Sequence, residues 1–346
     1  MKLFSLLTST RVLIYLFGIT MLCYLSILCS PVLFWPASFL SQLIPLFLVI
    51  QCGVLILLVL QRKKIAALPL LALLIGWPFL QSTFLFNSKR KNNYSIQVLS
   101  FNAKFFRQPR TYSKFSTEMI QWVANDTAAI KCLQEYSTNP KWAPLDATGQ
   151  IEKKGYQGYI FQADVVDRDH NPGMAIFSKF PMLDSGIVFE AQGTPNAAIF
   201  ADLNVNGKTI RVYNVHLASM NLELRENTGL AKIWYVIKRL KFGAIKRNQQ
   251  IKELLAHTKA SPYPFIICGD FNETPYSYNY RELKKEYPNT FEEVGRGFGF
   301  TFNELPYLLR IDHQFYTNNI KAVGYRVDLT MAISDHFATY GYYLIE

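Results

Sequence analysis

The sequence predicts three apolar helices followed by a mixed α/β domain of about 250 residues. Two observations lead to this fold class. All 25 acidic residues follow Phe86, so the region before that point and the region after it differ in character. In the second region, apolar β-rich runs alternate with polar helical stretches, as is typical of α/β domains. Half of the 346 residues are hydrophobic and 18% are charged, which excludes disordered chains and small disulfide scaffolds.

The first region contains three stretches without charge, at 12–30, 37–60 and 65–86. Each is long enough to cross a bilayer core, which needs about 20 apolar residues. A secretory signal peptide would contain one shorter apolar run, whereas this pattern occurs three times. The sequence therefore predicts three transmembrane helices, with buried helices of a soluble protein as the alternative. A function inside the membrane usually needs an ionisable residue, and these three stretches contain no charged residue. The helices are therefore expected to act as an anchor.

The positive charges around these stretches predict how the chain is oriented. The side that carries the N-terminus has five Lys and Arg residues, Lys2, Arg11, Arg62, Lys63 and Lys64. The other side has three, Lys89, Arg90 and Lys91. Cytoplasmic loops carry the excess of positive charge. The sequence therefore predicts a multi-pass protein of the cell inner (cytoplasmic) membrane with its N-terminus in the cytoplasm and residues 87–346 outside, in the periplasm or the extracellular space.

Residues 87–95 are polar and are expected to be a linker, and 96–346 to form one domain. Two stretches predict helices, Ser113–Asn125 and Leu230–Lys259. A two-residue hairpin turn is predicted at Asn206-Gly207, because both positions of such a turn need a positive φ. The runs that predict strands are Ile96–Phe101, Ala128–Leu133, Gly173–Phe177, Ala197–Val205, Thr209–Val215, Phe265–Cys268, Ile311–Tyr316 and Phe337–Leu344.

Polar side chains lie where several of these strands begin or end. Open sheets bind ligands at the ends of their strands, so these residues are expected to share one site. The set combines oxygen ligands with two imidazoles and comprises Asn102, Glu135, His216, Asp270, Asp312, Asp335 and His336.

Five short motifs strengthen this expectation. In chain order they are Leu133-Gln134-Glu135, Asn214-Val215-His216-Leu217, Gly269-Asp270-Phe271-Asn272-Glu273-Thr274-Pro275, Arg310-Ile311-Asp312-His313 and Ser334-Asp335-His336. Together they resemble the endonuclease/exonuclease/phosphatase family, the DNase I-like phosphodiesterases. The resemblance extends from about Gln97 to the C-terminus. It implies a DNase I-like four-layer sandwich, with two packed β-sheets flanked by helices.

Hydrolysis of a phosphodiester places negative charge on oxygens around phosphorus, so the site must supply a hard cation and hydrogen-bond donors. Mg²⁺ prefers oxygen ligands and keeps several waters, so one or two carboxylates suffice. We expect Glu135 to be the main metal ligand, with Asn102 assisting through its amide oxygen and Asp335 nearby. Mg²⁺ is the expected ion, with Mn²⁺ or Ca²⁺ as alternatives.

Among the histidines of the quoted motifs, His216 and His336 are the candidates for chemistry, because an imidazole can donate to a phosphate or pass on a proton. The resemblance implies that Asp312 pairs with His336 and that Asp270 orients or deprotonates the attacking water. It also implies that Asn272 donates to a phosphoryl oxygen in the transition state. Structural roles are expected for the remaining histidines, His170, His257 and His313.

The sequence departs from two branches of the family. Abasic-site endonucleases usually have an acidic residue two positions after the first Asn, where this chain has Lys104. That difference disfavours this branch and also a second carboxylate at the metal. Inositol-polyphosphate phosphatases usually carry Pro-x-Trp-Cys-Asp-Arg, whereas this chain has Leu308-Leu309-Arg310-Ile311-Asp312.

The net charge of +11 falls to +6 for residues 87–346, which contain 31 Lys and Arg residues and 25 acidic ones. A positive charge favours a nuclease that acts on DNA or RNA, by endo- or exonuclease action. The anchor favours an alternative to the nuclease, a sphingomyelinase-like phospholipid phosphodiesterase. Two further alternatives are a phosphatase and a non-catalytic module that binds phosphate ligands. The run Lys232–Lys252 has seven basic residues and no acidic one, and suits a nucleic-acid groove, a lipid headgroup patch or a solvated helix. No protein partner is predicted.

Overall fold

The computed structural model describes residues 9–87, 94–108, 114–164, 172–219, 229–304, 309–330 and 333–345. Lys2, most of the predicted linker and the basic run at 89–91 lie outside these residues. The chain divides into two compact units. The first comprises Met1–Leu85, Met220–Asn248 and Thr274–Glu282, and the second comprises Phe86–Ser219, Gln249–Glu273 and Leu283–Glu346. The first unit therefore includes two segments that follow the apolar region by more than a hundred positions.

The apolar region of the first unit forms a series of helices. They are α2 (Thr10–Ser26), α3 (Pro36–Gln42), α4 (Ile44–Leu60), η1 (Lys64–Ala66), α5 (Ala67–Ile75) and α6 (Trp77–Thr83). Within the described residues, none of them is by itself long and apolar enough to cross a membrane. Two bent pairs reach the required length and composition together: α3 with α4, bent by 43°, and the helix Lys64–Ile75 with α6, bent by 60°.

The expectation of three continuous spans is therefore not met. Pro45 and Pro78 stand at the second position of α4 and α6. A proline lacks the backbone N–H and its ring clashes with the carbonyl four residues earlier, so a helix breaks just before it. The first predicted stretch also ends early, because α2 stops at Ser26.

One buried hydrogen bond joins two helices of this unit, from the Gln51 Nε2 to the Thr20 Oγ1 at 2.8 Å. The segment Thr274–Glu282 is attached to the same helices. Thr274 donates to the Gln42 side chain at 2.8 Å, and the hydroxyl groups of Tyr276 and Thr83 are also 2.8 Å apart. The Tyr276 ring belongs to the same apolar cluster as Tyr24 and Phe79. These contacts explain why this segment groups with the first unit.

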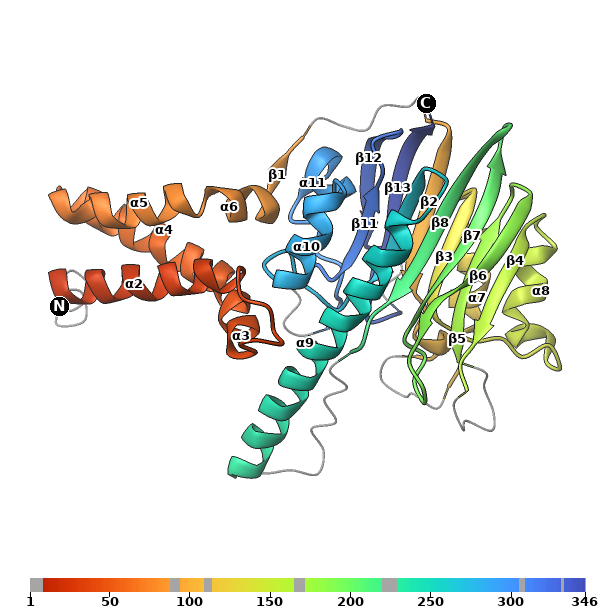
Figure 1. Ribbon diagram of the computed structural model, residues 1–346, viewed down its shortest axis with the longest axis horizontal. Coiled ribbons are helices and arrows are strands. Elements are labelled where there is room, and N and C mark those ends of the chain that lie inside the picture. The colour runs from red at the N-terminus through yellow and green to blue at the C-terminus, as the bar shows by residue number, and fades with distance from the viewer. Residues whose placement is uncertain are drawn as a thin grey trace. The chain divides into compact units, whose positions relative to one another are not determined.

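The second unit contains two large sheets (Figure 1). The six-stranded sheet has the order β12 (Ile320–Asp328), β13 (Ala338–Ile345), β2 (Ile96–Asn102), β3 (Ile130–Tyr136), β5 (Gly173–Ser178), β4 (Gln157–Gln162). The five-stranded sheet has the order β11 (Asp312–Tyr316), β9 (Phe265–Asp270), β8 (Lys208–His216), β7 (Ala197–Val205), β6 (Met182–Glu190). Neighbouring strands are antiparallel except for two pairs, β2 with β3 and β8 with β9. The predicted turn at Asn206-Gly207 joins β7 to β8, and both residues have a positive φ.

The two sheets pack face to face through a core of aliphatic side chains. Val98 and Ile176 of one sheet belong to the same buried cluster as Val212 and Ile266 of the other. The outer face of the six-stranded sheet is covered by α7 (Thr117–Asn125) and α8 (Ala147–Glu152). These helices and the sheet share a second buried cluster, which includes Phe101. Two short 3₁₀ turns accompany these helices, η2 (Lys104–Phe106) and η3 (Ala143–Leu145).

The outer face of the five-stranded sheet is covered by the C-terminal part of α9 (Gly229–Lys259). Its His257 ring lies against Phe200 of β7 and is 3.0 Å from the Tyr213 hydroxyl of β8. These layers give the α/β DNase I-like fold expected from the sequence. The remaining elements are α10 (Tyr278–Glu286), α11 (Thr290–Val294), β1 (Leu85–Phe86) and β10 (Arg296–Gly297).

Two buried amides link the sheets across this core. Asn214 of β8 donates to the backbone carbonyls of Leu133 and Ala175 in the other sheet, at 2.9 and 3.0 Å. Gln134 of β3 donates to the Asn214 Oδ1 at 2.6 Å. Both amides are fully buried, so their hydrogen bonds fix the position of β3 against β8. Each lies within two residues of a predicted site residue, Glu135 or His216.

Candidate active site

Neighbouring strands of the five-stranded sheet bring three predicted site residues together. His216 ends β8 and is paired with Asp270 at the end of β9. Asp270 is also paired with Asp312 at the start of β11. Because paired residues on adjacent strands lie side by side, the sheet alone fixes the positions of this imidazole and these two carboxylates. All three side chains are buried.

The six-stranded sheet supplies the opposite wall of the site. Asn102 ends β2 and is paired with Gln134 of β3. The next residue, Glu135, has a φ of +45° and lies where the pairing of β3 with β5 shifts register. Such a bulge re-aims the side chain, and here it turns the Glu135 carboxylate toward Asn102. His336 and Asp335 come just before β13, the strand next to β2.

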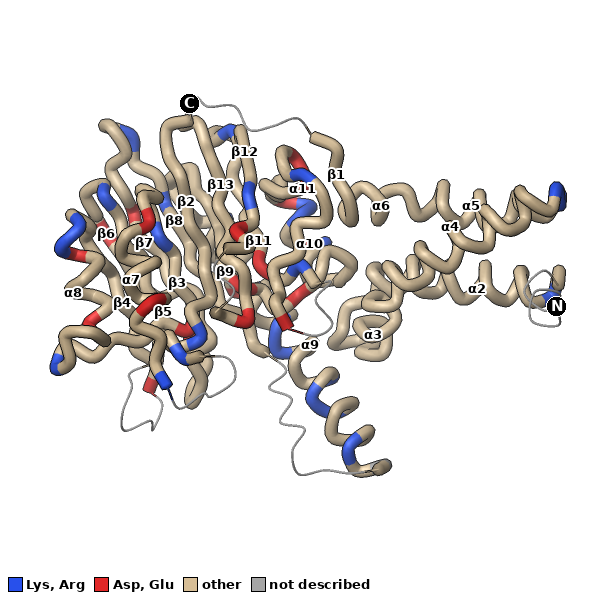
Figure 2. Tube along the Cα trace, turned by 180° about the vertical axis from the view of Figure 1, so that it is seen from behind, with Lys and Arg blue, Asp and Glu red and all other residues tan. Residues whose placement is uncertain are grey.

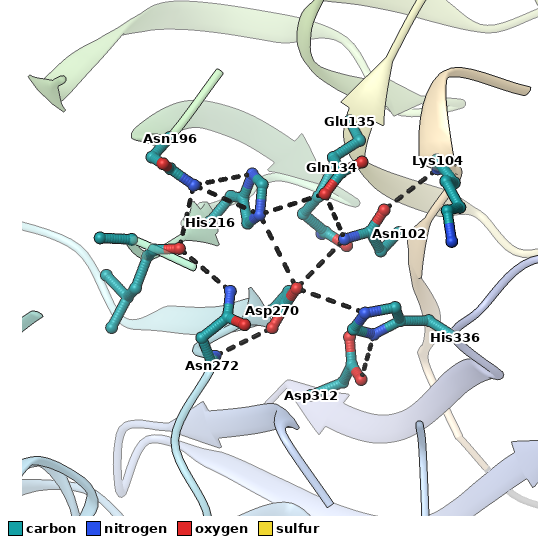
Figure 3. Close-up of polar contacts among 12 residues, drawn as sticks. Asn102, Lys104, Gln134, Glu135, Asn196, His216, Asp270, Asn272, Asp312 and His336 are labelled. Carbon is teal, nitrogen blue, oxygen red and sulfur yellow. Dashed lines mark hydrogen bonds and ion pairs between the residues drawn. The ribbon is translucent and has the colours of Figure 1, made fainter. Parts of the chain in front are cut away.

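The Asp270 carboxylate lies at the centre of this group (Figure 3). Its Oδ2 accepts a hydrogen bond from the Asn102 Nδ2 at 3.1 Å and is 3.7 Å from the His216 Nε2 and 3.6 Å from the His336 Nε2. Burial raises the pKa of Asp270, and the two imidazoles act in the opposite direction. A carboxylate with a raised pKa is a stronger base than one in water.

His336 and His216 have shifted pKa values of opposite sign. The His336 Nδ1 is 2.9 Å from the Asp312 Oδ2. Burial by itself would lower the pKa of His336, but Asp312 and Asp270 raise it well above its ordinary value. Burial lowers the pKa of His216, which Asp270 offsets only in part. At pH 7 the site therefore holds one charged imidazole and one neutral one, separated by a carboxylate.

Asn272 follows Asp270 in a tight turn. Its backbone N–H donates to the Asp270 Oδ1 at 2.9 Å, and its side-chain amide donates to the Leu217 carbonyl at 3.1 Å. Gly269, with a φ of +145°, makes this turn fit, since a Cβ there would collide with the Val215 carbonyl. The turn therefore holds the Asn272 amide beside Asp270.

The carboxylates on the other wall are more open to solvent. The side chain of Glu135 is 22% exposed and that of Asp335 is 17% exposed, against 2% for Asp270. The Glu135 Oε1 accepts a hydrogen bond from Asn102 at 3.3 Å and is 3.6 Å from the His216 Nε2. Burial and the charge of Asp335 raise the pKa of Glu135 to about 7.

These residues fit a divalent cation, which the fold family implies. Glu135, Asn102 and Asp335 offer the carboxylate and amide oxygens that hard cations prefer. Burial, followed by the negative charge of Asp335, raises the pKa of Glu135, and a bound cation would offset both effects. Ligand atoms of Asp270, Asp312 and His336 also lie within 4.8 Å of one another. In that group, however, Asp312 is already hydrogen-bonded to the charged ring of His336, so Glu135 remains the better candidate for the main ligand.

The structure adds residues that the sequence analysis did not assign. Asn196 lies against the His216 ring, 3.4 Å from its Nε2, and donates to the Leu217 carbonyl. No local signal marks Asn196 in the sequence. Gln134 and Asn214 link the two sheets, and their places inside the quoted motifs were the available signal. Lys104 was noted only as a departure from relatives, yet it forms an ion pair with Asp335.

Other polar residues of the motifs have structural contacts. The His313 Nε2 donates to the Glu273 carbonyl at 2.8 Å, and burial lowers the pKa of this imidazole to about 3. The Arg310 guanidinium stacks on Phe291 and pairs with Glu292. His170 lies outside the described residues.

Sequence and structure comparisons find similar proteins for most of the chain. The profile of the endonuclease/exonuclease/phosphatase family matches residues 99–336. A domain family of unknown function, DUF8431, matches residues 3–83. No curated protein matches the chain in sequence.

Solved structures share the fold of 72% of this chain. An endonuclease/exonuclease/phosphatase from Bacteroides vulgatus has a TM-score of 0.53 at 16% identity, over 99% of its own chain. A protein of the same description from Beutenbergia cavernae DSM 12333 has a TM-score of 0.52 at 15% identity, over 71% of its chain. The catalytic domain of human Nocturnin with bound sulfate has a TM-score of 0.51 at 18% identity, over 93% of its chain.

Proposed function

The chain belongs to the endonuclease/exonuclease/phosphatase family, and from this premise we propose that it is a metal-dependent phosphodiesterase. One observation carries the proposal. The buried Asp270 carboxylate lies between a charged imidazole, His336, and a neutral one, His216, beside oxygen donors that suit a divalent cation. Titratable groups whose pKa values are displaced in opposite directions are typical of acid–base sites.

In the proposed reaction a water oxygen attacks phosphorus, and its proton passes to Asp270. The bond from phosphorus to the leaving oxygen breaks, and that oxygen takes up a proton from solvent. His336 and His216 donate hydrogen bonds to phosphoryl oxygens, where negative charge develops. Asn272 donates a further hydrogen bond once its amide turns from the Leu217 carbonyl toward the substrate. The Asp312 carboxylate keeps His336 charged and oriented.

Glu135, Asn102 and Asp335 would hold the cation. The cation would offset negative charge on the phosphoryl and leaving oxygens. Mg²⁺ is the ion we propose, because the donor atoms are all oxygens and only a few of them come from the protein. The partial exposure of Glu135 and Asp335 supports entry of the ion and of the substrate from this side.

For the substrate we propose DNA or RNA. The net charge of +6 after residue 86 supports a polyanion. The first half of α9 adds support, because Lys and Arg recur along it without an acidic residue (Figure 2). Nucleic-acid binding by such a basic segment would depend strongly on salt.

A second candidate substrate is a phospholipid, acted on at its headgroup phosphodiester. The observation that favours it is the exposure of large apolar side chains among the basic residues of α9. Trp234 is 72% exposed, and Ile233 and Phe242 are more than half exposed. A helix with this composition is suited to the surface of an anionic membrane.

The experiment uses the purified full-length chain in detergent, with Mg²⁺ or with a chelator. Hydrolysis is measured side by side on DNA, RNA, a sphingomyelin, bis(p-nitrophenyl) phosphate and p-nitrophenyl phosphate. We expect Mg²⁺-dependent turnover that His216→Ala and Asp270→Asn each lower by about 10²-fold or more. The preferred substrate then separates nuclease, lipid phosphodiesterase and phosphatase. A folded chain that turns over none of them would overturn the enzyme proposal in favour of a non-catalytic binding module.

We also propose that residues 1–86 anchor the protein in the inner (cytoplasmic) membrane, with the phosphodiesterase domain outside. Many apolar side chains on these helices are exposed, including Tyr15 and Val49 at 71% and Leu60 at 77%, which supports contact with lipid. The two bent pairs supply the length for a crossing. Alkaline phosphatase fused after Phe86 should be active, and the same reporter fused after Leu60 should be inactive. An active fusion after Leu60 alone would reverse this topology.

A further inference from the structure

Lys104 is a cation built into the candidate active site. Its side chain is only 11% exposed, and its ammonium forms an ion pair with Asp335 and lies 3.5 Å from the Glu304 carboxylate. Its backbone N–H donates to the Asn102 Oδ1 at 3.1 Å, so the lysine and the amide are joined directly (Figure 3). A lysine is rarely buried unless its charge is paired, and here the pairing is with a residue of the site.

The backbone that carries Lys104 is unusual. Lys104, Phe105 and Phe106 have φ values of +44°, +55° and +56°. A left-handed conformation is unfavourable for a non-glycine residue, so three in succession persist only when the surroundings impose them. The Phe106 ring is buried against Tyr136, and its carbonyl accepts a hydrogen bond from the Ser116 N–H at 2.7 Å. The buried phenylalanine thus fixes a turn that directs Lys104 toward Asp335.

Asp335 is held in place on its other side. The Ser334 hydroxyl donates to the Asn102 carbonyl at 2.8 Å and lies 3.3 Å from the Asp335 Oδ1. The Asp335 carbonyl accepts a hydrogen bond from the Asn303 N–H at 2.6 Å. Lys104, Asn102 and Asp335 therefore form one rigid group, and the ion pair is part of the wall of the site.

The charged side chains of the site indicate the function of the ion pair between Lys104 and Asp335. Four carboxylates of the motifs gather here, Glu135, Asp270, Asp312 and Asp335, and Glu304 adds a fifth beside Lys104. They face two side-chain cations, Lys104 and His336. Carboxylates therefore outnumber side-chain cations, which suits the binding of a divalent ion. A second divalent ion at Asp335 would place two positive charges beside the Lys104 ammonium, and like charges repel strongly in a partly buried site.

We propose that the Lys104 ammonium takes the place of a second metal ion at Asp335, so that the site binds one divalent ion, on the Glu135 side. This inference rests on the proposed metal-dependent function and specifies how that site is built. Lys104 shares the Asp335 carboxylate with the ion, so that Glu135 and Asn102 remain the main ligands of that single ion. The ammonium stays in the site when the metal dissociates.

The test counts bound Mn²⁺ by electron paramagnetic resonance, on the full-length chain in detergent and without substrate. The wild-type protein should bind one Mn²⁺ per chain. Lys104→Glu replaces the ammonium with a carboxylate and should create a second site. Adding Asp335→Asn to that variant removes a ligand of the new site and should return the count to one. Near-ultraviolet circular dichroism checks that each variant keeps its tertiary packing.

Lys104→Arg and Lys321→Glu are the matched controls. Arginine keeps the positive charge, so the count should stay at one. Lys321 is exposed at the start of β12, far along the strand from the site, and its reversal changes the net charge equally without changing the count. Two Mn²⁺ ions in the wild type, or one in a folded Lys104→Glu variant, would overturn the inference and leave the phosphodiesterase proposal intact. No bound Mn²⁺ in the folded wild-type chain would overturn the metal-dependent function itself.

Discussion

The two sheets of the second unit contribute different chemistry to the same site. The five-stranded sheet supplies His216, Asp270 and Asp312 from paired positions on adjacent strands, and these side chains are almost completely buried. The six-stranded sheet supplies Asn102 and Glu135, and it is here that carboxylates reach solvent. One wall therefore suits proton transfer, which needs fixed geometry and shifted pKa values, and the other suits binding of an ion from solution.

His336 connects the two walls. It precedes β13 of the six-stranded sheet, but its ring is bonded to Asp312 of the five-stranded sheet. The proposed activity therefore depends on how firmly the two sheets are held together, as well as on the residues of each sheet. Variants on the two walls are therefore expected to lose activity in different ways.

The largest effect is expected on the proton-transfer wall. Asp270→Asn should lower kcat by about 10³-fold, because the amide cannot accept the proton of the attacking water. Binding of Mn²⁺ should persist, since Asp270 is not among the proposed ligands of the ion. The measurement pairs turnover of bis(p-nitrophenyl) phosphate with metal titration. Loss of Mn²⁺ binding in this variant would contradict the assignment of metal binding to the six-stranded sheet alone.

On the ion-binding wall, Glu135→Gln should lower the rate by about 10²-fold at limiting Mg²⁺, because the main ligand loses its charge. Raising the Mg²⁺ concentration should restore part of this activity, whereas no Mg²⁺ concentration should rescue Asp270→Asn. Rate measurements over a range of Mg²⁺ concentrations compare the two variants directly. If Mg²⁺ restored both variants equally, or neither, the two walls would not differ in function.

Asp312→Asn tests the residue that joins His336 to the proton-transfer wall. The rate at neutral pH should fall by about 10-fold to 10²-fold, because the imidazole loses its orienting partner. Asp312 raises the pKa of His336, so without it the charged form is lost at a lower pH. The alkaline limb of the pH profile of kcat/KM should therefore move toward lower pH. An unchanged limb would show that His336 does not act in its charged form.

The smallest effect concerns stability and separates a structural imidazole from the proposed catalytic ones. The pKa of His313 is lowered to about 3 in the folded chain, from 6.5 as its ordinary value. The unfolded chain therefore binds the proton first, so stability is present above pH 6.5 and is lost as the pH falls. Between pH 6.5 and 5.5 this loss should be about 1 kcal/mol.

The matched variant for this measurement is His313→Phe, because it keeps an aromatic ring beside Phe271 and Phe315. Urea unfolding of the full-length chain at both pH values gives the difference. The variant should lack this part of the pH dependence while titrating otherwise like the wild type. If the free energy of unfolding changes equally with pH in both proteins, His313 is not the source of that change.

Much of the fold could be predicted because apolar runs and turn residues mark the central strands. All eight predicted strands are present, with ends shifted by a few residues. The edge strands β4, β6 and β12 were not predicted. Several of their side chains are exposed, so they lack the continuous apolar pattern by which the central strands were recognised.

The first unit was predicted less well. Hydropathy locates apolar stretches but does not locate the breaks within them, and the kinks before Pro45 and Pro78 divide two of the expected helices. The attachment of Thr274–Glu282 to these helices depends on single side chains such as Tyr276. Contacts between residues so far apart in sequence leave no periodic pattern.

The site was predicted at the level of residue types and motif order. The structure brings all the proposed residues except Asp335 into contacts around Asp270, directly or through one neighbour. Asp335 lies beside them and faces Lys104. The bulge at Glu135 and the left-handed turn at Lys104 determine which way these side chains point. Both are backbone features that depend on packing across the sheet, so the local sequence could not reveal them.

The position of β13 has a consequence for how the protein is made. This strand lies between β12 and β2, and its Thr339 contacts Ser100, 239 positions earlier in the chain. During synthesis, β2 must wait with an unpaired edge until residues 338–345 have left the ribosome, a delay that invites mispairing. His336 arrives with that strand. A nascent or truncated chain therefore holds Asp270 and His216 without their partner, and assembly of the sheet and completion of the site occur in the same late step.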